Sequence, residues 1–384
     1  MALMTPVVRL LRELVALPSV NPAFLPAGDP RTGESRMADF VAATAATAGL
    51  TVEFQQVLPG RSNLLARLTP TGPTRHRVLL APHLDTVGQP HLDALLRPRV
   101  QAGRLTGRGA CDTKGCVAAM LEAVRRVARS GRRPSSTEIV FLGLIDEENG
   151  QTGSRFYAEQ ASRPEYAARL AVVGEPTRLE VVTAHKGDVW LQVRTRGRAA
   201  HGATPHLGRN AVHAMARVVE LLECEYRADL SRRSHPLLGS PTVNVGSIRG
   251  GTQPNIVPDD CVISVDRRTL PGESETAVRR EIRDLLKRHK LVATLDSLRT
   301  APCHPMETDP EHPLVVALCR AAGRRRTLGV DYFCDAAPLA EGGIPAVVFG
   351  PGDIAQAHTR DEWISLASLE RGTAILEGFL RNLE

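Results

Sequence analysis

The sequence predicts an α/β protein whose main domain is interrupted by a smaller α+β domain. Three observations support this. Apolar strand patterns alternate with helical patterns up to residue 178, two-residue alternation dominates from residue 179, and the first pattern resumes near residue 298. We therefore expect one discontinuous domain formed by residues 1–178 and 298–384. We expect residues 179–297 to form an inserted domain of typical domain size.

The elements of the first segment follow from hydrophobic periodicity. Apolar residues at helical spacing predict helices over residues 5–17, 34–48 and 115–130. Short apolar runs predict strands over residues 51–57, 62–68, 77–82, 137–145 and 170–174. Because the last three runs are almost continuously apolar, we expect strands that are buried on both faces, as in a parallel sheet.

The inserted segment has a different hydrophobic pattern, in which apolar and polar residues alternate. Residues 179–199 predict two strands that are joined by a turn at Lys186-Gly187-Asp188. The remaining predicted elements of this segment are a helix over 209–226, strands over 241–249 and 260–268, and a helix over 274–290. After it, the sequence predicts a helix over 312–325, a strand over 345–350 and a helix over 361–382.

Composition excludes several classes of partner. The net charge of +6 is spread along the chain rather than clustered, so we expect no nucleic-acid partner. No long uncharged apolar stretch predicts a membrane span, and Arg9, Arg12 and Glu13 interrupt the apolar start of the chain, so we expect no signal peptide. The seven cysteines are odd in number and form no CxxC pair. Together these features predict reduced thiols and a cytoplasmic location.

Polar residues gather where the predicted strands end. The run LLAPHLDTVG, for example, ends a strand with His83 and Asp85, and the members of the whole set are His83, Asp85, Asp112, Glu147, Glu148, Glu175 and His358. Each residue alone could be an ordinary hydrogen-bonded group, and Asp112 could simply cap the helix that follows it. In open α/β sheets, however, ligands bind beyond the carboxyl ends of the strands. Carboxylates that converge there would repel one another, so we expect a cation as their partner.

The residue types indicate which cation. Imidazole and carboxylate ligands without cysteine suit zinc or a similar first-row ion. Asp85 lies two residues after His83, on the same face of an extended chain, and could accept the second N–H of the imidazole. In the pair Glu147-Glu148, one carboxylate can bind the metal while the other moves a proton.

The ordered motifs resemble those of a known family. They are PHLDTVG, GRGACDTKG, DEENGQTGS, GEPT, AAHGATPHLGRNAV, NIVPDDCVISVDRRTLPGE and GPGDIAQAHTRDEW, and they cover nearly the whole chain. The sequence resembles the dinuclear-zinc M20 metallopeptidases, which include acetylornithine deacetylase, succinyl-diaminopimelate desuccinylase, aminoacylase and glutamate carboxypeptidases. The resemblance implies a zinc-peptidase-like α/β/α catalytic domain with an inserted ferredoxin-like α+β lid, often used for dimerisation. It also implies two divalent metal ions, expected to be zinc, for which cobalt can substitute.

The resemblance assigns roles to the metal-site residues. Asp112 would bridge both ions, and the peptide bond that follows it, Asp112–Thr113, would be cis. His83 and Glu175 would complete one metal, and Glu148 and His358 the other. By the same resemblance, Glu147 would be the general base and Asp85 would orient His83.

The resemblance also assigns substrate residues. His201 would cross to the active site of a partner subunit and stabilise the oxyanion. Asn255 and Arg268 would hold the substrate carboxylate, and Gly350 and Gly352 would shape the substrate loop before His358.

These expectations define a reaction class and several candidate substrates. The resemblance implies metal-assisted hydrolysis of the amide bond of an N-acyl amino acid, with N-acetylornithine as the first candidate and a place in arginine biosynthesis. Succinyl-diaminopimelate is the second candidate, and a dipeptidase or carboxypeptidase activity is the third. A catalytically silent binding protein is the alternative from another class. It would lack a metal ligand or the base, whereas every one of these positions is filled here.

Overall fold

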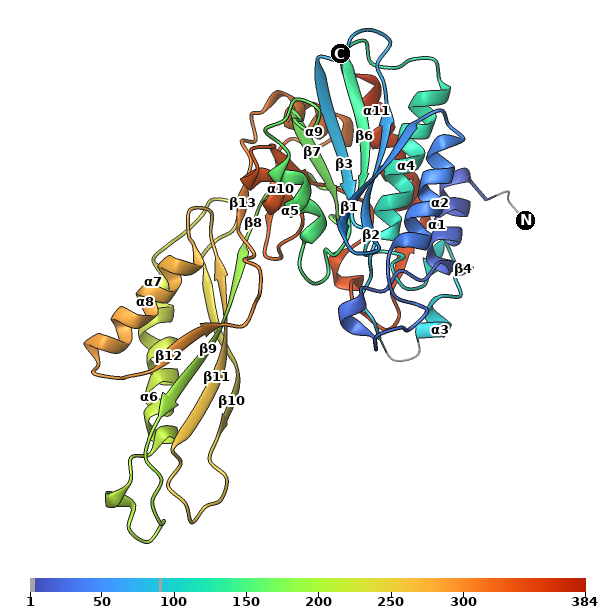
Figure 1. Cartoon of the computed structure of the whole chain (residues 1–384). Helices are drawn as coiled ribbons and strands as arrows, with labels where there is room; N and C mark the ends of the chain where they lie inside the picture. The colour runs from blue at the N-terminus through green and yellow to red at the C-terminus, as the bar shows by residue number, and fades with distance from the viewer. Residues whose placement is uncertain (1–3, 90–91) are drawn as a thin grey trace. The chain divides into compact units, whose positions relative to one another are not determined.

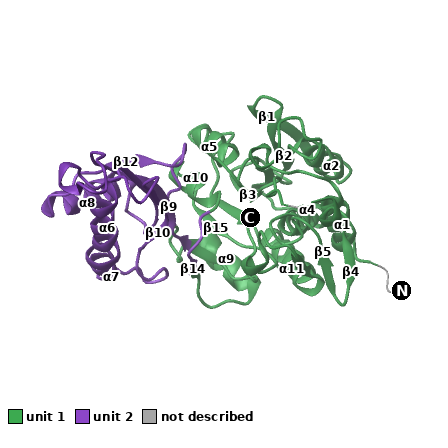
Figure 2. Cartoon of the chain, turned by 90° about the horizontal axis from the view of Figure 1, so that it is seen from below, with its two compact units in different colours: residues 1–183, 307–328, 334–384 green, residues 184–306, 329–333 purple. Residues whose placement is uncertain are grey.

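The chain divides into two compact units in the computed structural model, which describes residues 4–89 and 92–384 (Figure 2). The first unit comprises the residues up to 183 together with 307–328 and 334–384. The second comprises residues 184–306 and 329–333. The chain therefore leaves the first unit after residue 183, whereas the sequence predicted the boundary after residue 178.

The later boundary has a structural cause. β8 (Val182–His185) was expected to form a hairpin with the strand after it, but Val182 pairs with Val348 in the sheet of the first unit. β9 (Gly187–Arg196) belongs instead to the sheet of the second unit. Alternation along the sequence predicts a strand but does not say which sheet the strand joins, so the predicted hairpin was wrong.

The first unit is built on a mixed, nine-stranded sheet. Its main path runs β1 (Thr51–Leu58), β2 (Arg61–Leu68), β6 (Thr137–Gly143), β3 (His76–Pro82), β7 (Leu170–Gly174), β15 (Ala346–Val348), β8 and β13 (Met306–Glu307), and β14 (Leu328–Val330) pairs with β8. The central strands β6, β3, β7 and β15 are parallel, whereas β1 and β2 are antiparallel additions at one edge. The carboxyl ends of the parallel strands therefore meet at one edge of the sheet.

Helices cover both faces of this sheet (Figure 1). One layer consists of α1 (Pro6–Ala16), α2 (Ser35–Ala46), α4 (Lys114–Arg129), α9 (Pro313–Ala322) and α11 (Leu366–Arg381), and the other contains α5 (Thr152–Glu159) and α10 (Ala336–Glu341). In β3, Val78 and Leu80 join the core beneath the first layer, and Leu79 is equally buried outside that core. This two-sided burial explains the continuous apolar runs, and it gives the α/β/α architecture that the sequence predicted.

A small third sheet joins two distant segments of the chain. It contains β4 (Arg99–Gln101), β5 (Arg104–Thr106) and β16 (Trp363–Ser365) in the order β16-β5-β4. Residues 363–365 thus form a strand against β5, so the helix predicted from residue 361 begins only at Leu366. Here strand pairing overrides the helical pattern. The pairing brings the segment that follows β5 beside the segment that precedes β16.

The described part of the chain also has a short helix α3 (Leu92–Leu95) and 3-10 turns η1 (Pro22–Phe24), η2 (Pro205–Leu207) and η4 (Ile354–Gln356).

The second unit has a ferredoxin-like topology. Its elements follow in the order β9, α6 (Ala211–Leu221), β10 (Thr242–Gly250), β11 (Asp260–Thr269), α8 (Glu275–Arg288) and β12 (Thr294–Ser297), and the antiparallel sheet has the order β10-β11-β9-β12. This β-α-β-β-α-β arrangement includes β12, which the sequence did not predict. The helix predicted to residue 226 ends at Leu221 and continues as a π-helical turn, η3 (Leu222–Tyr226), and a short helix, α7 (Arg227–Ser231). Among the described residues of both units, no helix has the length and apolar character needed to cross a bilayer.

The central sheet predicts where stability is concentrated. Phe141 in β6 is fully buried in the core beneath α4, whereas Phe54 in the edge strand β1 is 47% exposed. Phe141→Ala is expected to lower the free energy of unfolding by about 3–5 kcal/mol, because it removes buried apolar surface and leaves a cavity. Phe54→Ala serves as the matched control, with an expected change within about 0.5–1 kcal/mol. Denaturant unfolding of both variants measures the difference, and equal losses would contradict this assignment of the core.

Candidate metal centre

The predicted ligands of the first unit lie together at the carboxyl edge of its parallel strands. His83 directly follows β3, and Glu175 directly follows β7. Glu147 and Glu148 lie on the segment after β6, beyond the bridge that pairs His83 with Leu144. Asp112 precedes α4, and His358 follows η4. Segments from five parts of the chain thus converge, as the strand-end pattern predicted.

The first ligand set consists of His83, Asp112 and Glu175. One ligand atom from each lies within 4.8 Å of the others, and all three residues are buried. Nε2 of His83 lies 3.2 Å from Oδ1 of Asp112 and 3.8 Å from Oε1 of Glu175. The imidazole therefore presents Nε2 to the carboxylates, while Nδ1 points away from them toward Asp85.

The second ligand set shares Asp112 with the first and adds Glu148 and His358. Nε2 of His358 lies 3.3 Å from Oδ2 of Asp112 and 3.0 Å from Oε2 of Glu148. Asp112 thus directs one oxygen to each histidine, which is the geometry that a bridging ligand requires. The peptide bond between Asp112 and Thr113 is cis, as the resemblance implied.

The chemistry of this donor set fits divalent cations. Oε1 of Glu148 is buried and accepts no hydrogen bond, which is costly for a carboxylate oxygen unless a cation lies near it. Burial, followed by the charge of Asp112, raises the pKa of Glu148 to about 7. Hydrogen bonds to Asp112 and Glu148 raise the pKa of His358 to about 10. Nearby carboxylates contribute to both shifts, and two divalent ions would balance their negative charge.

Asp85 connects His83 to the two glutamates. It is 1% exposed, and its carboxylate lies 3.4 Å from Nδ1 of His83. Nδ1 also lies 3.1 Å from the backbone carbonyl of Asp85. The Asp85 carboxylate accepts hydrogen bonds from the backbone N–H groups of Glu147 and Glu148, both at 3.2 Å, and from Asn21 at 2.7 Å. Burial opposes ionisation of Asp85, but the hydrogen bond with His83 and its charge lower the pKa overall.

Glu147 differs from its neighbour in its surroundings. Among the described residues it belongs to neither ligand set, although it interacts electrostatically with His83 and Glu175 of the first and with Glu148 of the second. Burial raises the pKa of Glu147 well above its usual range, and the carboxylates of Glu175, Asp335 and Glu148 add to this effect. A carboxylate with a raised pKa near a cluster of metal ligands has the properties of a general base, the role that the resemblance implied for it.

Three buried residues beside this site were not predicted from the sequence. Asp335 at the start of α10 is 1% exposed, accepts a hydrogen bond from Ser154 at 2.5 Å, and has a pKa that burial raises to about 7. Asn21 supports Asp85, and Glu362 holds the backbone of Asp112. These residues do not directly follow a strand of the main sheet, so the strand-end pattern could not find them. Only Glu362 left a signal, because it lies four residues after His358 in the motif GPGDIAQAHTRDEW.

The predicted substrate residues of the second unit lie at opposite ends of its sheet. His201 and Asn255 are exposed on adjoining loops, where Gly202 N–H donates to the Asn255 carbonyl at 2.8 Å. Arg268 pairs instead with Asp188 at the start of β9, and its guanidinium donates twice to Asp266. Residues 188–196 of β9 lie between the two ends, a distance of about 26 Å at ~3.3 Å per residue. Asn255 and Arg268 of one chain are therefore too far apart to hold the same carboxylate, and their roles toward a substrate stay a prediction.

Gly350 packs against the segment that carries Glu175. A Cβ atom at Gly350 would lie 2.6 Å from the backbone oxygen of Glu175 and 2.4 Å from Sγ of Cys116, so only glycine fits without displacement. Gly352 has a φ of +100°, which L side chains rarely adopt. Both glycines therefore shape the loop before His358, and contact of Gly350 with a substrate stays a prediction.

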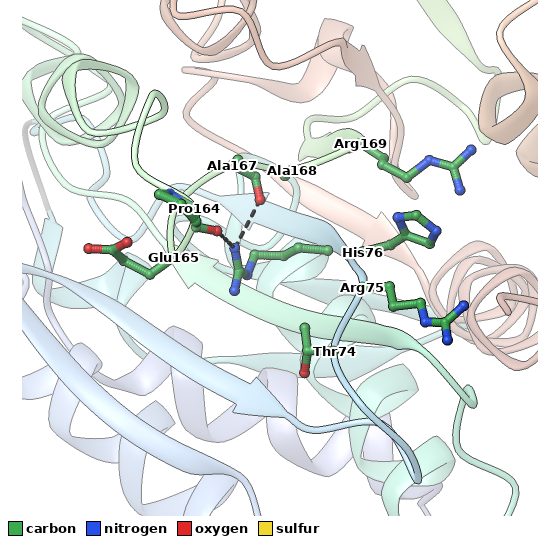
Figure 3. Close-up of a pocket in the computed structure, with 9 residues that line it drawn as sticks. Thr74, Arg75, His76, Pro164, Glu165, Ala167, Ala168 and Arg169 are labelled. Carbon is green, nitrogen blue, oxygen red and sulfur yellow. Dashed lines mark hydrogen bonds between the residues drawn. The ribbon is translucent and has the colours of Figure 1, made fainter.

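A separate cavity lies at the other edge of the same sheet (Figure 3). Its volume is about 660 Å³, and its lining includes His76 and Arg77 at the start of β3 and Arg169 before β7. The candidate metal ligands His83 and Glu175 follow the opposite ends of these two strands. This cavity is therefore not part of the metal centre. Arg77 is fixed there by hydrogen bonds to the carbonyls of Pro164 and Ala167 and by Glu138.

Comparison with known proteins agrees with this architecture. The family described as Peptidase family M20/M25/M40 matches residues 79–382. An acetylornithine deacetylase from Proteus mirabilis is 30% identical over 396 aligned positions, which cover 98% of this chain and 96% of the relative. An acetylornithine deacetylase from Vibrio cholerae is 31% identical and covers 89% of each chain.

Solved structures show the same fold at lower identity. A metallo-carboxypeptidase of the M20 family from Sulfolobus solfataricus has a TM-score of 0.79 at 17% identity, covering 98% of this chain and 99% of its own. A dinuclear metal binding peptidase of the M20 family from Bacillus subtilis has a TM-score of 0.71 at 12% identity, covering 98% and 96%. Together with the two sets of candidate ligands, these matches show that the chain belongs to peptidase family M20/M25/M40 and is a metal-dependent hydrolase of that family.

Proposed function

We propose that this protein hydrolyses the amide bond of an N-acyl amino acid at a centre of two divalent metal ions, with N-acetylornithine as the substrate. The observation that carries the proposal is the pair of ligand sets that share Asp112, with Glu147 beside both. Zinc is the proposed metal, because imidazole and carboxylate donors suit it, and cobalt is expected to substitute. His83, Asp112 and Glu175 would hold one ion, and Asp112, Glu148 and His358 the other.

Different groups of the site have different roles in hydrolysis. The two ions, when bound, would supply Lewis acidity and make a water molecule more acidic. Glu147 takes the proton from this attacking water and later returns it to the leaving amine. Burial, the main cause of its raised pKa, favours the protonated form that returns the proton to the amine. Asp85 keeps His83 in one orientation while also fixing the backbone of Glu147, so the ligand and the base keep their relative positions.

Removal of the base separates metal binding from catalysis. Glu147→Gln is expected to keep both ions, because Glu147 is in neither ligand set, and to lower kcat by about 10²–10⁴-fold because the amide cannot accept the proton. Metal analysis and steady-state kinetics on the same preparation measure the two effects. Glu165→Gln at the opposite edge of the sheet is the control and should leave both unchanged. Activity within a few-fold of wild type would contradict the assignment of Glu147.

Substrate identity rests on the relatives rather than on the geometry. The curated relatives at 30–31% identity carry the name acetylornithine deacetylase, which supports N-acetylornithine as the first candidate. The solved structures are too distant in sequence to indicate a substrate. Zinc-loaded protein is expected to hydrolyse N-acetylornithine with a higher kcat/KM than succinyl-diaminopimelate, other N-acetyl amino acids and dipeptides. A preference for succinyl-diaminopimelate or for dipeptides would replace the first candidate with the second or third.

The second unit supports a homodimer in which substrate residues are exchanged. His201 and Asn255 lie about 26 Å or more from Arg268 along the sheet, so one small substrate can contact both ends only if they come from different chains. His201 is exposed, and its Nδ1 accepts a hydrogen bond from Ala203 N–H at 3.1 Å. With Nδ1 accepting, the proton of the imidazole is on Nε2, which is then a donor for an oxyanion. We therefore infer that His201 and Asn255 serve the site of a partner subunit and Arg268 the site of its own.

Mixed dimers test this exchange directly. Glu147→Gln and His201→Ala should each be nearly inactive alone, because each removes one group from every site. When the two variants are dissociated and reassembled together, roughly a quarter of wild-type activity is expected, because about half of the dimers are mixed and each mixed dimer has one intact site. His206→Ala, which changes another exposed histidine of the same loop, is the control. No recovery in the mixture, or an active monomer, would contradict the exchange.

A further inference from the structure

A buried carboxylate that is not a metal ligand lies directly behind the metal centre. Glu362 is fully buried, and its Oε1 accepts hydrogen bonds from the backbone N–H groups of Cys111 at 2.8 Å and Asp112 at 2.9 Å. Its Oε2 accepts from Gly109 N–H at 2.9 Å and from the Arg108 guanidinium at 2.6 Å. A carboxylate has about four acceptor positions, and donors occupy all of them here. Glu362 therefore cannot bind an ion and can only hold the groups around it.

Arg108 extends this support to the segment that carries His358. It is 1% exposed, and besides its bond to Glu362 it donates to the carbonyl of Thr359, the residue after His358, at 3.2 Å. The backbone N–H of Gly107 also donates to the carbonyl of Glu362 at 3.0 Å. The segments 107–112 and 359–362 are thus held together by a network whose central member is the Arg108–Glu362 ion pair.

The fold explains why these two segments meet. Thr106 at the end of β5 pairs with Trp363 at the start of β16 in the small third sheet. The chain that leaves β5 toward Asp112 therefore runs beside the chain that arrives at β16 from His358. Arg108 and Glu362 lie at this junction. Their hydrogen bonds connect the paired strands to the backbone of Asp112 and of Thr359, the residue after His358.

The two ligand sets depend unequally on this junction. His83 and Glu175 each follow a strand of the main sheet, and those strands pair directly through Pro82 and Gly174. The side chain of His358 is 55% exposed and belongs to a segment outside that sheet. We propose that the Arg108–Glu362 pair is a positioning device: it fixes Asp112 relative to His358 and thereby sets the affinity of the ion held by Asp112, Glu148 and His358. This inference rests on the proposed two-ion hydrolase.

The substitution Glu362→Gln tests this role with little change in shape. An amide nitrogen in place of one carboxylate oxygen would face backbone N–H groups that also donate, and Arg108 would lose its buried counter-charge. Zinc-loaded protein is to be titrated with a competing chelator while the released zinc is measured. The wild type should release two ions. In the variant we expect one ion to be retained as in the wild type and the other to bind about 10–100-fold more weakly.

A matched control separates positioning from general destabilisation. Glu138 is another buried carboxylate of the same unit, and it pairs at 2.5 Å with Arg77, which lines the cavity at the opposite edge of the sheet. Glu138→Gln should lower thermal stability but leave the affinity of both ions unchanged. Substitution of cobalt for zinc adds a spectroscopic reading, because a displaced His358 would alter the visible absorption of only one of the two ions.

A second variant covers failure of the first to fold. Arg108→Lys keeps the charge, but a single ammonium cannot span both Glu362 and the Thr359 carbonyl as the guanidinium does, so a smaller loss at the same ion is expected. Wild-type affinity for both ions in the folded variants, or an equal loss in Glu138→Gln, would overturn the proposal. A wild-type protein that binds two ions yet hydrolyses no N-acyl amino acid would instead contradict the proposed function and leave the positioning role standing.

Discussion

The buried carboxylate of Asp85 is the constraint on which the metal centre depends. An ionised carboxylate is expensive to bury unless hydrogen bonds and opposite charge compensate for the lost hydration. Here the compensating donors are Nδ1 of His83, the backbone N–H groups of Glu147 and Glu148, and the side chain of Asn21. The partners that make this burial possible are the same groups that the site needs in fixed positions. A proposed ligand from each set and the proposed base therefore share one support.

The support continues one layer outward through Asp146. Its φ of +66° turns the backbone just before the two glutamates, and its carboxylate accepts hydrogen bonds from Asn21 at 2.9 Å and from Arg61 at 3.1 Å. Arg61 also pairs at 2.5 Å with Glu34, which is 1% exposed. The unfavourable backbone conformation is thus held by a buried network rather than by a single contact. Asn21 donates to both Asp85 and Asp146 and so joins this network to Asp85. A displacement of Asp146 is therefore expected to move Asp85 as well.

Sequence patterns predicted the parts of this protein that depend on local order. The positions of His83 and Glu175 follow from apolar runs that end at a strand terminus, and the structure places both at the same edge of the sheet. Glu362 and Asp335 escaped prediction because their partners are distant in sequence, and no local period marks a carboxylate that binds backbone N–H groups elsewhere. β8 was assigned to the wrong sheet for a similar reason, since alternation indicates a strand but not its neighbours.

The candidate metal ligands and most of the predicted substrate residues lie in different units. Every candidate metal ligand and the candidate base belong to the first unit, whereas His201, Asn255 and Arg268 belong to the second. Changes in the exposed loops of the second unit therefore leave the candidate ligands and the candidate base unaltered. Proteins named as aminopeptidase, carboxypeptidase and amidase share this fold over 98% of the chain, so the fold alone does not indicate a substrate. For the same reason, the metal centre indicates the reaction and the second unit must be probed to identify the substrate.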